Sequence, residues 1–247
     1  MQRRLKVSTA VGCADLLDLE HQVRFIDDHT DYFHLDVKDG YYVPTFGVGP
    51  DFLKGIRGIV TKPMDAHLMV QRPWDHLEAF AEAGATWLTP HADVIENLAL
   101  VTVHRIKALG CRAGVALNPA RPLESIRYYL PYLDKVTIML VDAGIAGQPV
   151  IPELYQKIHT LAGWREELGL DFLIEADGSM NGDLYADLYR AGADMVVAGP
   201  PALWNKHEDF ERAWEIMEEE LAAATAGSCG RATDIAAPAR NPPGKGM

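Results

Sequence analysis

The chain has 247 residues, of which 48% are hydrophobic and 23% are charged, the balance of a globular protein with one large core or two small ones. Its formal net charge of −12 argues against nucleic-acid binding, because phosphate contacts need a basic face. Cys13, Cys111 and Cys229 lie far apart without metal-type spacing, which suits a reducing compartment. No apolar run has the length of a signal peptide or a membrane span, so we expect a cytoplasmic protein that binds neither nucleic acid nor membrane.

Short apolar segments alternate with amphipathic ones along the chain, the pattern of a protein built from strand–helix units. Strands are expected at residues 5–11, 33–37, 64–70, 86–90, 112–117, 135–141, 172–176 and 195–198. Helices are expected at residues 16–28 with Asp15 as N-cap, shortly after Pro50, and at 74–83, 95–109, 123–130, 152–168, 184–190 and 207–223.

Eight strand–helix units favour a parallel sheet, and eight is the number that closes a (β/α)₈ barrel. We therefore expect an α/β protein, a single-domain TIM barrel over residues 1–223. A doubly wound open sheet is the alternative. Residues 224–247 are rich in Ala, Gly and Pro without periodicity, so a disordered C-terminal tail is expected there.

The second expected strand carries polar side chains on one face. Because successive residues of a strand point to opposite sides, His34, Asp36 and Lys38 share one side while Leu35 and Val37 take the other. Burying an imidazole or a carboxylate without a partner costs roughly 2–7 kcal/mol per group. A divalent metal ion would satisfy both groups, so this strand indicates a metal site.

Two further strands carry polar groups where an apolar core strand is expected. The third places Asp65 and His67 on one face, and the seventh ends in Glu175 and Asp177. The carboxyl ends of barrel strands meet at one mouth, where active sites lie. Two imidazoles and two carboxylates meeting there would suit Zn²⁺, Mn²⁺, Fe²⁺ or Co²⁺. The four side chains expected to converge are His34, Asp36, His67 and Asp177.

Simpler explanations exist for each group taken alone. A strand histidine is often a satisfied core residue, and an aspartate at a strand end often caps the next helix. Four such groups on three strands favour a site over these explanations. His91, at the end of the fourth strand, is compatible with a contact around that site, a substrate contact, or no role.

Glycine-rich loops follow the last three strands. Backbone N–H groups in such loops can hold a phosphate, and the loops after strands seven and eight are the usual phosphate site of these barrels. Each loop alone is weak evidence, because a glycine after a strand is often only a turn. The loop residues that would contact the substrate are Gly144, Ala146, Gly147, Gly178, Ser179 and Gly199.

Taken together, these segments resemble the ribulose-phosphate 3-epimerase family, and within it the D-allulose-6-phosphate 3-epimerases most closely. The similarity follows the family's order from residue 6 to residue 217, across the whole barrel. The matching segments are residues 33–40 (FHLDVKDG), 43–44 (VP), 65–70 (DAHLMV) with 72–73 (RP), 114–119 (GVALNP), 147–149 (GQP) with 151–152 (IP), and 174–179 (IEADGS).

The resemblance implies an isomerase that inverts carbon 3 of a ketose phosphate, such as ribulose 5-phosphate or allulose 6-phosphate. One divalent ion (Zn, Mn, Fe, Co or Mg) would be held by the four converging side chains. Asp36 and Asp177 would also be the acid/base pair, one on each face of the sugar, and the ion would stabilise the enediolate. Family resemblance also suggests a homo-oligomer whose partner molecule is a small sugar or sugar phosphate.

The resemblance assigns further substrate contacts. Met69 and Met139 match methionines that cap the intermediate with polarisable, water-excluding sulfur. Ser8 belongs to an entry segment that normally contributes a substrate-binding hydroxyl. In the same segment this chain has Ala10 where the family has serine and Gly12 where it has methionine.

Other departures affect the substrate loops. Lys38 replaces an active-site methionine, and an ammonium beside a dication is repelled unless it turns outward or meets an anionic group. Thr45 replaces an asparagine, and 143–145 reads AGI where the family has PGF. Pro200 and Pro201 follow Gly199 where the family has Ser or Thr, and proline has no N–H to donate.

These departures leave several activities open. A divergent family member could act on a smaller or unphosphorylated ketose, with Lys38 binding a different group. A lyase on a related phosphate-binding barrel could use Lys38 as a Schiff base or as an electrostatic group. A non-catalytic metal- or sugar-binding barrel is the third alternative.

Overall fold

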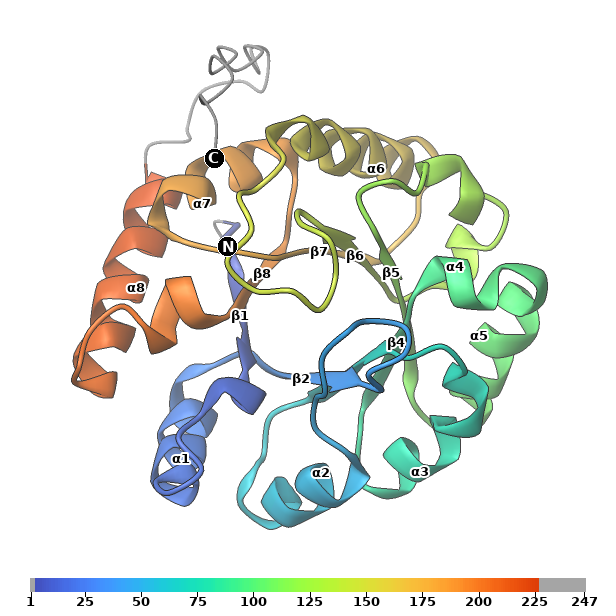
Figure 1. Ribbon diagram of the computed structural model, residues 1–247. Coiled ribbons are helices and arrows are strands. Elements are labelled where there is room, and N and C mark those ends of the chain that lie inside the picture. The colour runs from blue at the N-terminus through green and yellow to red at the C-terminus, as the bar shows by residue number, and fades with distance from the viewer. Residues whose placement is uncertain (1–2, 227–247) are drawn as a thin grey trace, which may run out of the picture.

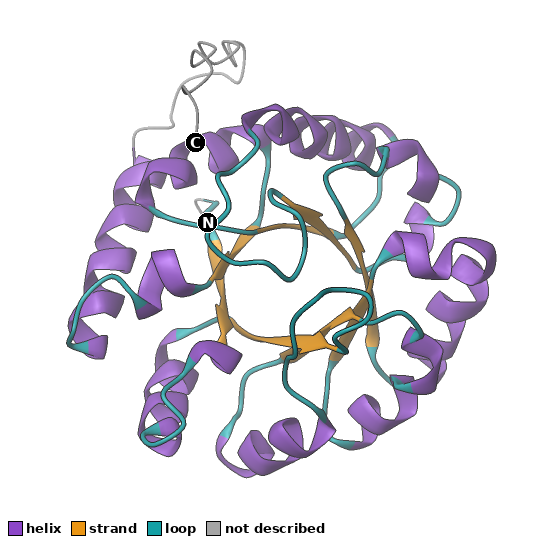
Figure 2. Ribbon diagram, viewed as in Figure 1, coloured by secondary structure: helices purple, strands orange, loops and turns teal. Residues whose placement is uncertain are grey.

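A computed structural model describes residues 3–226, which form a closed eight-stranded parallel barrel inside a ring of helices (Figure 1). Each strand pairs with the next in sequence, and β8 pairs with β1, so the sheet has no free edge (Figure 2). The strands are β1 (Lys6–Ala10), β2 (Tyr32–Lys38), β3 (Met64–Met69), β4 (Trp87–Pro90), β5 (Arg112–Leu117), β6 (Lys135–Met139), β7 (Leu173–Asp177) and β8 (Met195–Ala198).

The helices cover the outer face of the barrel. They are α1 (Leu19–His29), α2 (Pro50–Ile56), α3 (Leu77–Glu82), α4 (Ala92–Ile95), α5 (Ala99–Ala108), α6 (Tyr155–Glu167), α7 (Gly182–Ala191) and α8 (Phe210–Ala226). Short 3₁₀ turns are η1 (Val11–Cys13), η2 (Arg57–Ile59), η3 (Pro73–Asp75), η4 (Glu96–Leu98), η5 (Leu123–Ile126), η6 (Leu130–Tyr132) and η7 (Pro152–Leu154), and η8 (Pro200–Trp204) is a π-helical turn.

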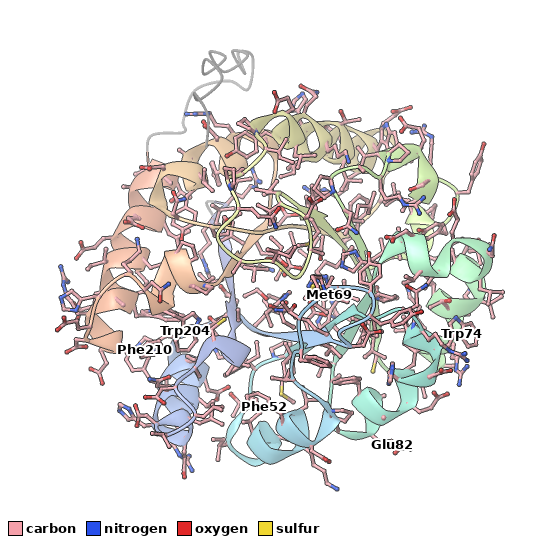
Figure 3. The ribbon with its side chains drawn as sticks, viewed as in Figure 1. Phe52, Met69, Trp74, Glu82, Trp204 and Phe210 are labelled. Atoms are coloured by element: carbon pink, nitrogen blue, oxygen red, sulfur yellow. The ribbon has the colours of Figure 1, made fainter. Side chains whose placement is uncertain are left out.

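The main apolar core lies between the barrel and this ring. Phe33, Tyr185 and Trp214 are fully buried in it. The rings of Trp204 and Phe210 stack with centroids 4.9 Å apart, where η8 meets the start of α8 (Figure 3). This packing leaves the inside of the barrel free for polar side chains.

The closed barrel is confirmed, and the open sheet is excluded. The helix predicted at residues 123–130 is wrong, because only the turns η5 and η6 form there. Pro131 removes an N–H and disfavours the helical conformation of the residue before it. The first helix begins at Leu19, because Asp15 accepts a hydrogen bond from the Leu17 N–H in a local turn instead of capping a helix at residue 16.

The last helix, α8, reaches Ala226, past the boundary expected at residue 223. The remainder of the predicted tail lies outside the described residues. No helix in the described part of the chain has both the length and the apolar character that crossing a bilayer requires.

The strand register brings interior side chains from different strands to similar heights. Asp36 of β2 pairs in register with His67 of β3, and Met139 of β6 pairs with Asp177 of β7. All four residues lie in the carboxyl-terminal halves of their strands. The polar groups expected to form a site therefore occupy one end of the barrel.

Candidate metal and acid/base site

The structure brings together one nitrogen of each of two histidines and one oxygen of each of two aspartates. His34 Nε2 lies 3.2 Å from His67 Nδ1 and 3.2 Å from Asp36 Oδ1. His67 Nδ1 lies 3.5 Å from Asp36 Oδ1 and 3.4 Å from Asp177 Oδ2, and His34 Nε2 lies 3.7 Å from the same Asp177 oxygen. All four atoms lie within 4.8 Å of one another.

These separations suit one coordinated ion. Four ligand atoms placed about 2.0–2.2 Å from a tetrahedral centre are about 3.3–3.6 Å apart, close to the distances between these side chains. The donor set of two imidazoles and two carboxylates is also appropriate for a divalent first-row metal. These four residues therefore fit the divalent metal ion that the sequence predicts.

The electrostatics of the site also favour a bound cation. Burial lowers the pKa of His67, but hydrogen bonds with Asp177 and Asp36 outweigh it and raise that pKa to about 9. Burial likewise lowers the pKa of His34, and the hydrogen bond with Asp36 raises it above the ordinary value. The two carboxylates thus make this position favourable for positive charge, whether carried by protons or by a metal ion.

Lys38 reaches the edge of the same site. Its Nζ lies 3.3 Å from Asp36 Oδ2, while Asp36 Oδ1 faces the two histidines. Burial would raise the Asp36 pKa, but the hydrogen bonds from His34 and His67 hold it well below the usual range. Asp36 is therefore an ionised carboxylate shared between the histidines and an ammonium.

A second polar cluster lies deeper in the barrel. Lys135 Nζ donates to Asp65 and, at 2.6 Å, to Glu175, and all three side chains are buried. Thr89 Oγ1 donates to Asp65 at 2.7 Å, and Thr137 Oγ1 donates to Glu175 at 2.6 Å. We call Asp65, Lys135 and Glu175 the deep cluster, and His34, Asp36, His67 and Asp177 the upper site. The two groups approach each other at His34, whose Nδ1 lies 3.8 Å from Asp65 Oδ2.

His91 is fully buried next to the upper site. Its ring is nearly parallel to that of His67, with centroids 5.0 Å apart, and the two Nε2 atoms are 2.9 Å apart. Beyond it, the Tyr42 hydroxyl donates to the Asp93 carboxylate at 3.0 Å and accepts from Asn118 Nδ2 at 2.7 Å. A polar chain therefore runs from His67 toward the loop that follows β2.

Two loops meet over the mouth of the barrel (Figure 1). Thr45 Oγ1, in the loop after β2, donates to the Gly144 carbonyl in the loop after β6 at 2.8 Å. Beneath them Val43, Met69 and Met139 form a small apolar cluster, and Figure 3 places Met69 inside the ring of strands. The methionines thus lie between the covering loops and the polar site.

One cavity opens at this mouth. It is lined by Asp36, Asp177 and most of the substrate contacts expected from the sequence: Lys38, Met69, Met139, Gly144, Ala146, Gly147, Gly178, Ser179 and Gly199. Ser8 is the exception, because it is fully buried in β1 and lies below Ala10, the residue of that strand that lines the cavity. The expected substrate contact of Ser8 stays a prediction, because its side chain lies below the part of the barrel that lines the cavity.

The part of the cavity wall formed by the loops after β7 and β8 has an unusual composition for a phosphate site. Gly178 and Ser179 adopt positive φ angles of 113° and 52°, which shape a tight turn directly after Asp177. A Cβ atom on Gly178 would lie 2.6 Å from Val141 Cγ2, so only glycine fits there. Pro200 and Pro201 also line this wall and offer no N–H.

Known proteins are similar in sequence to most of this chain. Residues 6–203 match the model of the ribulose-phosphate 3 epimerase family. The chain belongs to this family. Within the family, it is 37% identical over 204 residues to the ribulose-phosphate 3-epimerase of Synechocystis sp., a match that covers 81% of this chain and 87% of that protein. It is 38% identical over 219 residues to that of Escherichia coli K12, covering 87% and 96%.

Solved structures share the fold at low sequence identity. The structure of KGPDC from Streptococcus mutans matches with a TM-score of 0.68 and 14% identity, over 89% of this chain and 98% of that one. The 3-hexulose-6-phosphate synthase of Salmonella typhimurium matches with a TM-score of 0.64 and 15% identity, over 89% and 100%. These likenesses support the barrel alone.

Sequence reasoning missed some polar residues of the interior. The sequence predicts Lys135 only as the first residue of a strand. Lys135 and Thr137 share one face of that strand, however, as His34 and Asp36 share a face of theirs. The rule that found the histidines could have found this lysine. Tyr42, in contrast, carries no local signal, because its partner Asp93 lies 51 residues away.

Proposed function

We propose that the protein is a metal-dependent 3-epimerase of a ketose phosphate. The observation that carries this proposal is the meeting of Asp36 and Asp177, which line the cavity at the barrel mouth, with His34 and His67. Membership of the ribulose-phosphate 3-epimerase family supports the reaction class. His34, Asp36, His67 and Asp177 would hold one divalent ion.

The reaction requires two acid/base groups. A hydrogen on carbon 3 of a ketose is acidified by the neighbouring carbonyl, so a carboxylate can remove it as the electron pair moves to the carbonyl oxygen and gives an enediolate. A divalent ion in the site would supply positive charge that offsets the charge developing on the sugar oxygens. A carboxyl group on the opposite face then delivers a proton to carbon 3 and inverts it.

Asp36 and Asp177 fit these two roles. They come from β2 and β7, both line the cavity, and each has an oxygen facing the histidines. Met69 and Met139 would cover the planar intermediate and keep water away from it. The histidines, which are fully buried, would orient the ion and take no proton from the sugar.

The phosphate would lie against the loops after β6, β7 and β8. Gly144, Gly147 and Gly178 have positive φ angles and line the cavity, so their backbone can approach a ligand closely. Ribulose 5-phosphate and allulose 6-phosphate are the two substrate types that the sequence suggests. A cytoplasmic location and a homo-oligomeric assembly stay predictions of the sequence.

Two observations favour an altered substrate within this class. Lys38 adds a cation to the cavity wall, and the two prolines after Gly199 remove N–H donors where the phosphate would lie. An unphosphorylated or differently charged ketose is therefore the second candidate. A lyase that uses Lys38 as a nucleophile is less favoured, because an ammonium paired with a carboxylate at 3.3 Å is a poor nucleophile.

Solvent-deuterium incorporation at carbon 3, followed by NMR, tests the proposal. Ribulose 5-phosphate, allulose 6-phosphate and the matching unphosphorylated ketoses are each incubated with metal-loaded enzyme and with enzyme stripped by a chelator. We expect exchange and epimerisation only in the metal-loaded enzyme, with more than tenfold higher kcat/KM for a phosphate. Absence of exchange with every ketose would rule out the proposed chemistry.

A Lys38→Met variant separates the two substrate candidates. If Lys38 binds an anionic part of the sugar, KM should rise roughly tenfold or more with that sugar, since a charged hydrogen bond is worth about 1.5–3 kcal/mol. Lys54→Met, on the exposed surface of α2, is the matched control. An unchanged KM with all four sugars would exclude a substrate contact for Lys38.

A further inference from the structure

His91 is a buried imidazole that the proposed reaction does not use. It follows β4, lies outside the four-ligand cluster, and is fully buried. Its Nε2 is 2.9 Å from Nε2 of His67, and the planes of the two rings differ by only 18°, so the rings meet edge to edge in nearly one plane. Two ring nitrogens at this distance must share one hydrogen, so one ring donates and the other accepts.

The direction of this hydrogen bond follows from the other nitrogen of His67. His67 Nδ1 faces His34, Asp36 and Asp177 at 3.2–3.5 Å, and it must be unprotonated to bind a cation. The proton of a neutral His67 then lies on Nε2 and points at His91. His91 Nε2 must therefore be bare, and its own proton must lie on Nδ1.

The Asp93 carboxylate favours that tautomer through its charge, although it lies too far away to accept a hydrogen bond from His91. His91 Nδ1 has no hydrogen-bond partner among the described residues, and it lies 4.0 Å from Asp93 Oδ1. A carboxylate at this distance attracts a proton on Nδ1. Asp93 is in turn held by the Tyr42 hydroxyl at 3.0 Å, which accepts from Asn118.

Tyr42 connects this chain to the cover of the site. It lies in the loop after β2, next to Val43, which packs with Met69 and Met139 over the polar groups. The chain Tyr42–Asp93–His91–His67 thus joins the substrate-covering loop to a predicted metal ligand.

We propose that His91 is the positioning residue for His67: it accepts the His67 Nε2–H and so aims the Nδ1 lone pair at the metal. The charge of Asp93, which Tyr42 holds in place, favours the accepting tautomer of His91. Groups that hydrogen-bond the far nitrogen of a metal-ligating histidine fix its orientation. Here that group is a second histidine, whereas His34 has the carboxylate of Asp65 near its far nitrogen. The inference rests on the proposed metal site.

Metal affinity tests the inference without measuring turnover. Zn²⁺ dissociation constants are measured by chelator competition for wild type, His91→Phe, His91→Gln and Tyr42→Phe. His91→Phe fills the same space without an acceptor and should weaken Zn²⁺ binding about 10–100-fold. His91→Gln offers an acceptor oxygen and should recover part of the loss, and Tyr42→Phe should cost less than about tenfold. His159→Phe, on the exposed side of α6, should bind as wild type.

Nitrogen-15 NMR of the Zn²⁺-loaded wild type provides a second readout that needs no variant. His67 Nε2 should carry a proton, and His91 Nε2 should not. A protonated His91 Nε2, or wild-type Zn²⁺ affinity in His91→Phe, overturns this inference alone. A wild-type protein that binds no Zn²⁺ overturns the metal site and this inference together, so the two failures are distinguishable.

Discussion

Two groups of carboxylates lie inside the barrel, and their charges are balanced in different ways. In the deep cluster, Lys135 donates to both Asp65 and Glu175, so the chain supplies its own cation. In the upper site, Asp36 and Asp177 face two imidazole nitrogens at 3.2–3.7 Å. Neutral imidazoles bring no charge, and Lys38 at the edge of the site pairs with Asp36 at 3.3 Å, so an excess of negative charge is left that protons or a bound cation would offset.

His34 is common to both groups. Its Nε2 faces the upper site, and its Nδ1 lies 3.8 Å from Asp65 in the deep cluster. A histidine placed in this way can give its lone pair to a metal while its N–H faces a carboxylate. The deep cluster thus lies against one side of His34, and the upper site borders the cavity at the barrel mouth.

The difference explains why only one group is a candidate for chemistry. In the deep cluster the buried ammonium of Lys135 offsets part of the charge of Asp65 and Glu175, and the whole cluster is closed off from solvent. Asp36 and Asp177, in contrast, line the cavity and can meet a substrate. Access to the cavity distinguishes Asp36 and Asp177 from Asp65 and Glu175, although all four are carboxylates.

The largest expected effect is on the reaction itself. Asp177→Asn removes one of the two acid/base groups and should lower kcat/KM for epimerisation by about 10²–10⁴-fold at saturating metal. The remaining carboxylate of Asp36 can still remove and return a proton on its own face. Deuterium exchange should therefore survive for one epimer of the sugar only, and for the other epimer in Asp36→Asn.

Asp171→Asn is the control for this pair. Asp171 is exposed and precedes β7 at the end of the barrel opposite Asp177, so the same change of charge should leave both reactions intact. Exchange of both epimers in Asp177→Asn would contradict the two-base assignment. Loss of both exchanges, with metal still bound, would also contradict it.

The second prediction breaks the deep cluster. Lys135→Met keeps most of the side-chain volume but leaves Asp65 and Glu175 buried and uncompensated, a loss that typically costs about 3–5 kcal/mol. Urea unfolding of the metal-free protein measures this. Adding Glu175→Gln should restore part of the stability because one buried charge disappears.

Lys54→Met, on the protein surface, should change the unfolding free energy by no more than about 0.5 kcal/mol. A Lys135→Met protein as stable as wild type would show that the carboxylates of the deep cluster take up protons at little cost. In that case the two groups of carboxylates would differ in solvent access alone.

The sequence predicted which side chains point into the barrel, but not how high along the barrel each of them lies. Alternation along a strand identified which side chains face the barrel interior, and it placed His34, Asp36 and His67 together. Alternation does not give the height of an interior side chain along the barrel axis. Ser8 and Ala10 share one face of β1, yet only Ala10 lines the cavity, because the height of a residue follows from strand tilt and register.

Partners far apart in the chain were also beyond sequence reasoning. Lys135 reaches Asp65 across 70 residues and Glu175 across 40, and nothing local to any of them indicates the contact. The helix predicted at residues 123–130 failed for a different reason. Its apolar spacing resembled a helix, while Pro131 limits the segment to 3₁₀ turns.

The third prediction concerns a carboxylate that is satisfied without any cation. Asp39, at the start of the loop after β2, accepts backbone N–H groups of Tyr41, Tyr42 and Gln71 at 2.7–2.8 Å. Burial opposes the change, but these hydrogen bonds hold the pKa of Asp39 below its usual 3.8. Asp39→Asn replaces the oxygen facing Gln71 by a donor and should cost about 1 kcal/mol at pH 7.

The sign of the pH dependence follows from the lowered pKa. A carboxyl group with a lower pKa in the folded state stabilises the protein above its unfolded-state pKa, and this contribution is lost as the pH falls through the folded-state pKa. The gap in unfolding free energy between wild type and Asp39→Asn should therefore be full at pH 7 and shrink below a pH of about 4. Asp171→Asn, on the exposed surface, is the control for the same change of side chain. A gap that does not shrink on acidification would show that the charge of Asp39 does not stabilise this loop.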